Sequence, residues 1–160
     1  MKKIFILFTI AATTLFTSCT DETIIEENFF LAQTFEVTTT LFFNSNTNIY
    51  ETDFISIPSN IEVFESDAIL AYRLEAVANG NDVWSQLPQN FFLSNGDIIQ
   101  YVFNHTFFDV QVQLDGQYDP NTLPVDFTDN QTFRFVVVPS EFANANMTME
   151  QAIETFNLQY

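Results

Sequence analysis

The chain has few of the residue types that most enzymes and metal sites use. Among 160 residues it has one histidine, His105, one cysteine, Cys19, and four lysines and arginines against 21 aspartates and glutamates. A single cysteine excludes an intramolecular disulfide, and one residue of each ligand type is too few for a zinc site. Nucleic-acid binding is also excluded, because it depends on clustered cations and the net charge here is −17.

Catalytic and cofactor motifs are missing as well. The sequence has neither a Gly-x-Gly-x-x-Gly fingerprint nor a phosphate-binding loop, which excludes nucleotide and redox chemistry. No Gly-x-Ser-x-Gly elbow presents a serine to His105, whose neighbours predict a strand end or a turn. Two carboxylates would suffice for a glycosidase, but the spacing does not show that any two converge. We expect no enzyme activity, with a carboxylate-based glycosidase as the residual alternative.

The N-terminus has the parts of a bacterial signal peptide. Two lysines precede an uncharged apolar run of 13 residues from Ile4 to Phe16, and a polar pair leads to Cys19. This run is shorter than the roughly 17–25 residues of a membrane span, so we expect residues 1–18 to be cleaved. Residues 15–19, Leu-Phe-Thr-Ser-Cys, resemble the lipobox of bacterial lipoproteins, which implies a lipid on Cys19. An ordinary secretory signal with an incidental cysteine is the alternative.

The segment after Cys19 is acidic and predicts a destination. Loss of residues 1–18 removes two lysines and no acid, which changes the net charge from −17 to −19. Asp21 and Glu22 resemble the acidic signal that sends lipoproteins of the Bacteroidota to the cell surface, although a solvated tether is the plain alternative. We expect residues 19–33 to tether a domain of residues 34–160 to the outer membrane, at the cell surface or alternatively at its periplasmic face.

The pattern of the domain predicts strands. Apolar and polar residues alternate with a period of two in 35–41 and 110–114, and further β-branched and aromatic runs lie at 49–57, 68–74, 98–103 and 132–138. All three glycines follow Asn or Asp, which favours tight hairpin turns at Asn79-Gly80, Asn95-Gly96 and Asp115-Gly116. We predict an all-β antiparallel two-sheet sandwich, Greek-key or meander, of about seven or eight strands, with a barrel as second choice.

The C-terminal segment predicts one short helix. Thr148 and Gln151 have the spacing of a capping box, and Met149, Ile153 and Phe156 share one helical face. We therefore expect a helix over residues 149–156.

Several segments resemble a group of small uncharacterised flavobacterial (Bacteroidota) lipoproteins with a C-terminal β domain. They are residues 65–75, 79–84, 87–89 and 132–139, and the similarity covers most of residues 34–160. Some members carry collagen-like repeats after the cysteine, but this chain has no glycine before Gly80, so no stalk is implied. The group has no established activity, and the resemblance therefore implies an architecture and no chemistry.

Aromatic residues supply the candidate ligand contacts. Trp84 follows the turn at 79–82 on an expected loop; we favour a core position for its ring, and stacking of the indole on a sugar is the alternative. Adjacent phenylalanines send one ring to each face of a strand, and we expect loops or the helix to cover the outer rings rather than leave them exposed. These pairs are Phe29-Phe30, Phe42-Phe43, Phe91-Phe92 and Phe107-Phe108.

Charged residues supply two weaker candidates. Asp115 and Asp119 could hold a calcium ion, although turns capped by their side chains are the plainer interpretation. Arg73 and Arg134 lie in expected strands and should pair with neighbouring carboxylates, with a clamp for a substrate carboxylate as the alternative.

These observations rank three hypotheses for the function. The first is a non-enzymatic cell-envelope lipoprotein that contributes binding or structure at the outer membrane, without a cofactor other than its lipid. Its partners would be the membrane, through the lipid anchor, and an envelope protein or glycan, with no nucleic acid or nucleotide. The second is a carbohydrate-binding module, and the third is a carboxylate-based glycosidase.

Overall fold

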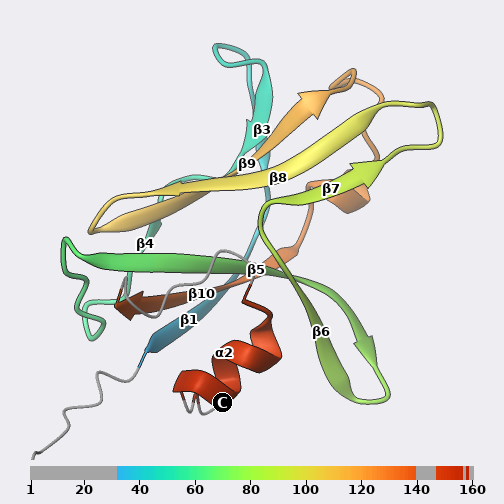
Figure 1. Ribbon diagram of the computed structural model, residues 1–160. Coiled ribbons are helices and arrows are strands. Elements are labelled where there is room, and N and C mark those ends of the chain that lie inside the picture. Colours follow the sequence, from blue (N-terminus) through green and yellow to red (C-terminus); the bar gives the residue numbers. More distant parts are fainter. Residues whose placement is uncertain (1–31, 140–146, 157, 159–160) are drawn as a thin grey trace, which may run out of the picture.

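Two antiparallel sheets lie face to face in a computed structural model that describes residues 32–139, 147–156 and 158 (Figure 1). Sheet A has the strand order β1-β10-β5-β6, and sheet B has the order β2-β3-β9-β8-β7, with β4 also paired to β9. One α-helix, α2 (Met149–Phe156), lies in the described residues. The predicted two-sheet sandwich with a short C-terminal helix is confirmed.

The described residues form ten strands, more than the predicted seven or eight. The excess comes from short edge strands that the hydrophobic pattern does not separate. The strands are β1 (Gln33–Thr39), β2 (Phe42–Asn44), β3 (Ile49–Glu51), β4 (Ile55–Ser56), β5 (Asp67–Ala78), β6 (Asn81–Gln86), β7 (Gln89–Phe92), β8 (Ile98–His105), β9 (Asp109–Gln117) and β10 (Gln131–Pro139). A single turn of 3-10 helix, η1 (Val125–Phe127), precedes β10.

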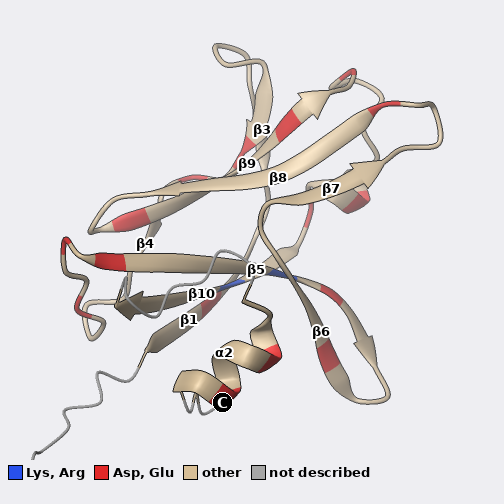
Figure 2. Ribbon diagram, viewed as in Figure 1, with Lys and Arg blue, Asp and Glu red and all other residues tan. Residues whose placement is uncertain are grey.

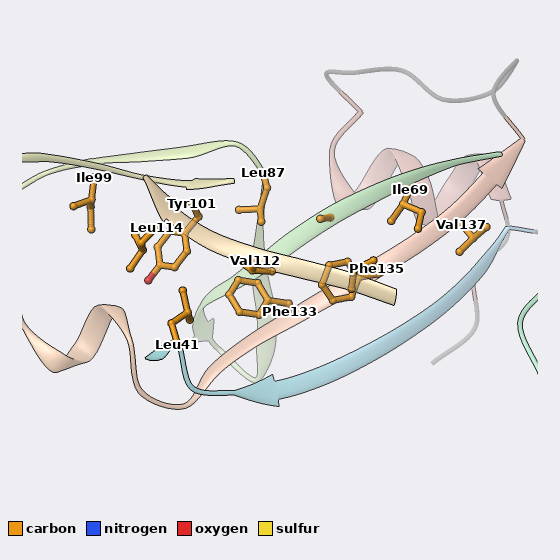
Figure 3. Packing of buried hydrophobic residues seen from close by; sticks show 12 residues of the cluster. Leu41, Ile69, Leu87, Ile99, Tyr101, Val112, Leu114, Phe133, Phe135 and Val137 are labelled. Carbon is orange, nitrogen blue, oxygen red and sulfur yellow. The ribbon is translucent and has the colours of Figure 1, made fainter. Parts of the chain in front are cut away.

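The main core fills the space between the sheets (Figure 3). Tyr101 on β8 and both Phe133 and Phe135 on β10 are fully buried there, and Phe35 on β1 stacks on Phe135 with 5.1 Å between ring centroids. The long strands β1, β8, β9 and β10 contribute alternate residues to this layer, as a period of two requires. Burial of these large rings stabilises the sandwich, because the hydrophobic term grows with the apolar area removed from water.

A second core lies between sheet A and the helix. Tyr72 and Val136, from the central strands of sheet A, pack with Met149, Ala152 and Phe156 of α2. The predicted capping box is confirmed: the Thr148 amide donates to Gln151 Oε1 at 2.9 Å, and the Gln151 amide donates to Thr148 Oγ1 at 3.2 Å. Strand β10 is therefore buried on both faces, which explains its continuous apolar run.

The predicted hairpin turns differ in outcome. Asn79-Gly80 joins β5 to β6 with positive φ at both residues (54° and 82°), and Asn95-Gly96 lies between β7 and β8, so these two predictions are confirmed. The prediction at Asp115-Gly116 is wrong, because Gly116 lies inside β9, opposite Ile99, with φ of 137°. Strands β7, β8 and β9 form a meander, but β5 and β6 belong to the other sheet.

No helix in the described part of the chain is long and apolar enough to cross a membrane. The expected signal peptide, Cys19, Asp21, Glu22 and most of the tether lie outside the described residues. Strand β1 begins at Gln33, one residue before the expected start of the domain.

Candidate functional site

Between β3 and β4, residues 52–54 stand opposite only two residues of β9, 111 and 112, an irregularity at Thr52 that we call the bend. The Thr52 amide donates to Val112 O at 2.9 Å, and Thr52 Oγ1 accepts a hydrogen bond from the Val112 amide at 3.1 Å. The hydroxyl takes the role that a main-chain carbonyl has elsewhere in the ladder, so the Thr52 carbonyl can accept from Gln111 Nε2 at 3.0 Å. Thr52 is 2% exposed and holds this bend, while Asp53 and Phe54 after it are exposed.

This bend and strand β2 border an open depression of about 360 Å³. Three exposed phenylalanine rings line it, and two of them are largely in solvent: Phe42 is 59% exposed, Phe43 43% and Phe54 65%. The other lining residues are polar or acidic and lie on β2, in the turn after it, on β3, at the bend and on β9: Asn44, Ser45, Glu51, Thr52, Asp53 and Gln111. The depression therefore combines apolar ring surface with hydrogen-bonding groups, the composition that ligand sites commonly have.

Hydrogen bonds orient the polar side chains of this depression. Asn44 Nδ2 donates to Glu51 Oε1 at 2.6 Å, and Gln113 Nε2 contacts Glu51 Oε2 at 3.5 Å and Gln111 Oε1 at 3.4 Å. Within the described part of the chain, Asp53 has no hydrogen-bond or ion-pair partner. Glu51 is thus held in place by two amides, whereas the Asp53 carboxylate is available to a ligand.

The depression carries negative charge without a nearby cation. Glu51 and Asp53 line it, and the two arginines of the described residues lie on β5 and β10 of sheet A (Figure 2). The chain as a whole has a net charge of −17. An anionic ligand would be repelled at this place, because like charges are not compensated.

The depression continues onto an uncovered sheet face. Helix α2 packs on sheet A, while no described helix or further sheet packs on the outer face of sheet B (Figure 1). The strand register puts outward side chains in rows, including Phe42, Glu51 and Gln113 in one and Phe92 with Ile98 in another. Phe92 is 80% exposed and Ile98 41%. This face therefore exposes aromatic and amide groups.

The paired phenylalanines correct one expectation. Phe91 packs edge-on against Tyr101 at 5.9 Å, and Phe92 points outward, so this pair divides between the two faces as predicted. The expectation that outer rings are covered is wrong for Phe42, Phe92 and Phe108, which are 59%, 80% and 77% exposed. Phe107-Phe108 lies in the turn before β9 rather than in a strand, and Phe29-Phe30 lies outside the described residues.

Trp84 lies on the other side of the sandwich from the depression. The prediction of a loop is wrong, because Trp84 belongs to β6, opposite Leu74 of β5. It is half-buried against the cluster between sheet A and the helix, and the Arg134 guanidinium lies 4.1 Å from its ring centroid. One ring face is therefore occupied by a cation. A ligand contact at Trp84 stays a prediction and would need the other ring face or the displacement of Arg134.

The two arginines have different partners. Arg134, 6% exposed in its side chain, forms an ion pair with Glu36 and donates from Nε to Glu36 Oε1 at 2.6 Å, which confirms the expected pairing. Arg73 instead donates to Gln131 Oε1 at 2.8 Å and lies 4.8 Å from the Tyr101 ring, so its expected carboxylate partner is wrong for the described residues. Burial raises the pKa of Tyr101 to about 12, against an opposing effect of Arg73.

The remaining candidates are His105, Asp115 and Asp119. His105 ends β8, as predicted, and its ring stacks on Phe103 at 6.4 Å. Asp115 Oδ1 accepts from the Gly116 amide at 2.7 Å, but both residues lie inside β9, so the expected turn cap is wrong for Asp115. Asp119 Oδ1 accepts from the Asn121 amide at 2.9 Å in the turn after β9, as a side-chain cap does. Among the described residues no three His, Cys, Asp or Glu side chains are grouped closely enough to hold a metal ion. The calcium hypothesis stays a prediction.

The sequence pattern missed the depression itself. Glu51, Asp53 and Phe54 lie inside the run 49–57, which predicts one continuous strand, and the polar pair Thr52-Asp53 is the only local sign of the bend. Comparisons of the chain with protein-family models, with curated proteins and with solved structures gave no match. The candidate site therefore depends on its geometry alone.

Proposed function

We propose that this protein is a non-enzymatic lipoprotein of the bacterial outer membrane that binds a partner through the outer face of sheet B. The observation that carries the binding role is the depression between β2 and the bend, where Phe42 and Phe54 leave more than half of their surface in solvent. Exposed rings beside oriented polar groups favour a binding surface, because ligand sites combine apolar surface with a few placed polar groups. A single exposed phenylalanine without such neighbours would carry no such meaning.

The arrangement of the domain supports display away from a membrane. Strand β1, which the tether enters, begins at one end of the molecule, and the β2–β3 hairpin lies at the other end (Figure 1). A lipid on Cys19 would hold the first end near the membrane. The depression beside the hairpin would then face outward, where the negative charge of the domain also keeps it away from anionic headgroups.

Protease shaving of intact cells tests the location. We expect the wild-type domain to be digested, and a variant with Asp21→Asn and Glu22→Gln to be protected because it remains at the periplasmic face. The Cys19→Ala variant should no longer sediment with membranes, since it lacks the lipid. A periplasmic marker protein that stays intact is the control. Protection of the wild type contradicts surface display, and normal sedimentation of Cys19→Ala contradicts the anchor.

Glycoside hydrolysis is the second candidate, because the depression brings two carboxylates, Glu51 and Asp53, to one place. Glu51 is already bound by two amides, which favours a positioning role over proton transfer. Release of reducing sugar from a panel of oligosaccharides, lost in the Asp53→Asn variant, would support hydrolysis. No release from the panel leaves binding as the function.

A further inference from the structure

We propose that the depression between β2 and the bend at Thr52 binds an uncharged carbohydrate chain. This inference rests on the proposed binding function and adds the class of ligand. It depends on three properties of the lining residues: the exposed rings, the mixture of hydrogen-bonding groups and the sign of the charge.

The rings supply flat apolar surfaces to the ligand. Phe42 lies on β2 and Phe54 follows the bend, so the rings approach the depression from two different segments. The face of an aromatic ring is electron-rich and attracts the weakly positive C–H groups on one face of a pyranose. Contact with a sugar would also remove these rings from water, which is favourable by about 25 cal/mol for each Å² of apolar surface.

The polar groups include both donors and acceptors. Ser45 offers a hydroxyl, and the Asp53 carboxylate accepts. The amides of Asn44 and Gln111 already donate to Glu51 Oε1 and to the Thr52 carbonyl, so each keeps one further N–H for a ligand. A sugar hydroxyl donates one hydrogen bond and accepts others, so a mixed lining suits it. The amides on Glu51 hold its carboxylate in a fixed orientation, which reduces the entropy lost when a ligand binds.

The charge excludes some ligands and favours others. Two carboxylates without a cation oppose uronic-acid chains, sulfated glycans and phosphates. A cationic peptide is the competing ligand, since ammonium groups bind carboxylates and ring faces. Glu51 is already hydrogen-bonded by amides, so Asp53 is the one carboxylate of the depression without a described partner. A cation would leave the hydroxyl and amide groups of the lining unmatched, and an uncharged glycan would not.

The depression is open and lies on a sheet face, so it can accept internal units of a long chain as well as an end. A glycan that lies across the bend would contact Phe54 and Phe42 together. Removal of one of these rings should therefore weaken binding without abolishing the fold, because both rings are largely in solvent.

Calorimetric titration of the purified full chain in mild detergent tests this proposal. The probes are cellohexaose, xylohexaose, mannohexaose, maltohexaose and laminarihexaose, with polygalacturonate as the anionic comparison and octalysine as the cationic one. We expect at least one hexaose to bind, and Phe54→Ala to weaken it about tenfold, the equivalent of about 1.4 kcal/mol. Phe108→Ala is the matched control, since it removes a ring that is 77% exposed from the turn before β9, outside the lining of the depression, and should leave affinity unchanged.

Trp84 gives an independent readout in the same titration. It lies on sheet A, beside the helix, and its emission should stay constant when a hexaose binds. An emission change that survives Phe54→Ala would assign the sugar site to Trp84 and overturn our proposal.

Other outcomes overturn the glycan inference while leaving a binding protein. No heat with any hexaose up to about 5 mM, where even weak glycan binding is detectable, is one such outcome. Octalysine binding that is lost in high salt and in Asp53→Asn is another, and equal weakening by Phe108→Ala is a third. Failure of the proposed location is distinguishable from these outcomes. Protection of the wild-type domain from protease, or membrane sedimentation of Cys19→Ala, would contradict surface display or the lipid anchor without changing the affinity of the purified protein for a hexaose.

Discussion

Substitution of Gly116 by alanine tests how β8 and β9 pair. An added Cβ would collide with the main-chain oxygen of Ile98 and lie 3.0 Å from Ile99 Cα. Both contacts are with backbone, so no flexible side chain can move to make room. The φ of 137° is also a conformation that residues with a Cβ rarely adopt.

These two effects set the size of the loss. Positive φ in alanine costs about 1–2 kcal/mol. Separation of the strands to relieve the collision would weaken neighbouring ladder hydrogen bonds at about 1 kcal/mol each and disturb packing by about 1–3 kcal/mol. We expect Gly116→Ala to lower the free energy of unfolding by about 4 kcal/mol, a large share of the stability of a small domain.

Urea unfolding followed by far-UV circular dichroism measures the effect. With a slope of about 1.5 kcal/mol per molar urea, the midpoint should fall by more than about 2 M. Gly80→Ala is the matched control, because φ there is 82° and an added Cβ has no atom within 4 Å, so only strain is introduced. Equal midpoints for the two variants would refute the strand position of Gly116 and restore the hairpin turn that its sequence predicts.

Three further predictions concern substitutions of single side chains. Because burial raises the pKa of Tyr101 to about 12, the folded state keeps its proton between pH 10 and 12 while the unfolded state loses it. Stability should therefore be constant below pH 10 and fall by about 3 kcal/mol towards pH 12, and Tyr101→Phe should lack this part of the decrease in alkaline unfolding curves. Thr52→Val removes the acceptor of the Val112 amide and should lower the free energy of unfolding by about 1–3 kcal/mol, whereas Thr52→Ser should retain most of it. Arg134→Met takes the guanidinium away from the Trp84 ring and should change its fluorescence spectrum; an unchanged spectrum would contradict this contact.

Local signals explain which parts of the fold are predictable. The helix bounds follow from the capping box of Thr148 and Gln151 and from one apolar face, all within a few residues. The long strands follow from their period of two. Asp115-Gly116 has the same local pattern as Asn79-Gly80, and only the approach of Ile98 from another strand distinguishes the strand position from a turn. A contact with another strand therefore decides between a turn and a strand position, because the Asp-Gly dipeptide alone is compatible with both.

The position of Trp84 shows the same limit. Its neighbours 81–86 are mostly polar, so the pattern predicts a loop, but the hairpin at Asn79-Gly80 aligns them with β5 and creates an edge strand. Strand pairing satisfies the backbone groups of this segment without a strongly apolar face. Short edge strands such as β2 and β7 are hidden from sequence patterns for the same reason.

The candidate site depends on register across three segments that are distant in sequence. Phe42 lies opposite Glu51, and Glu51 lies opposite Gln113, so one row of the depression requires β2, β3 and β9 to be aligned correctly. The bend adds a second requirement, because the Thr52 hydroxyl must replace a ladder acceptor. The bend also leaves β4 only two residues long and places the charged Asp53 before it, two features that hinder pairing with a strand of another molecule. The irregularity that protects this edge of the sheet therefore also forms the depression, and a variant that straightens the strand should lose ligand binding and gain a tendency to aggregate.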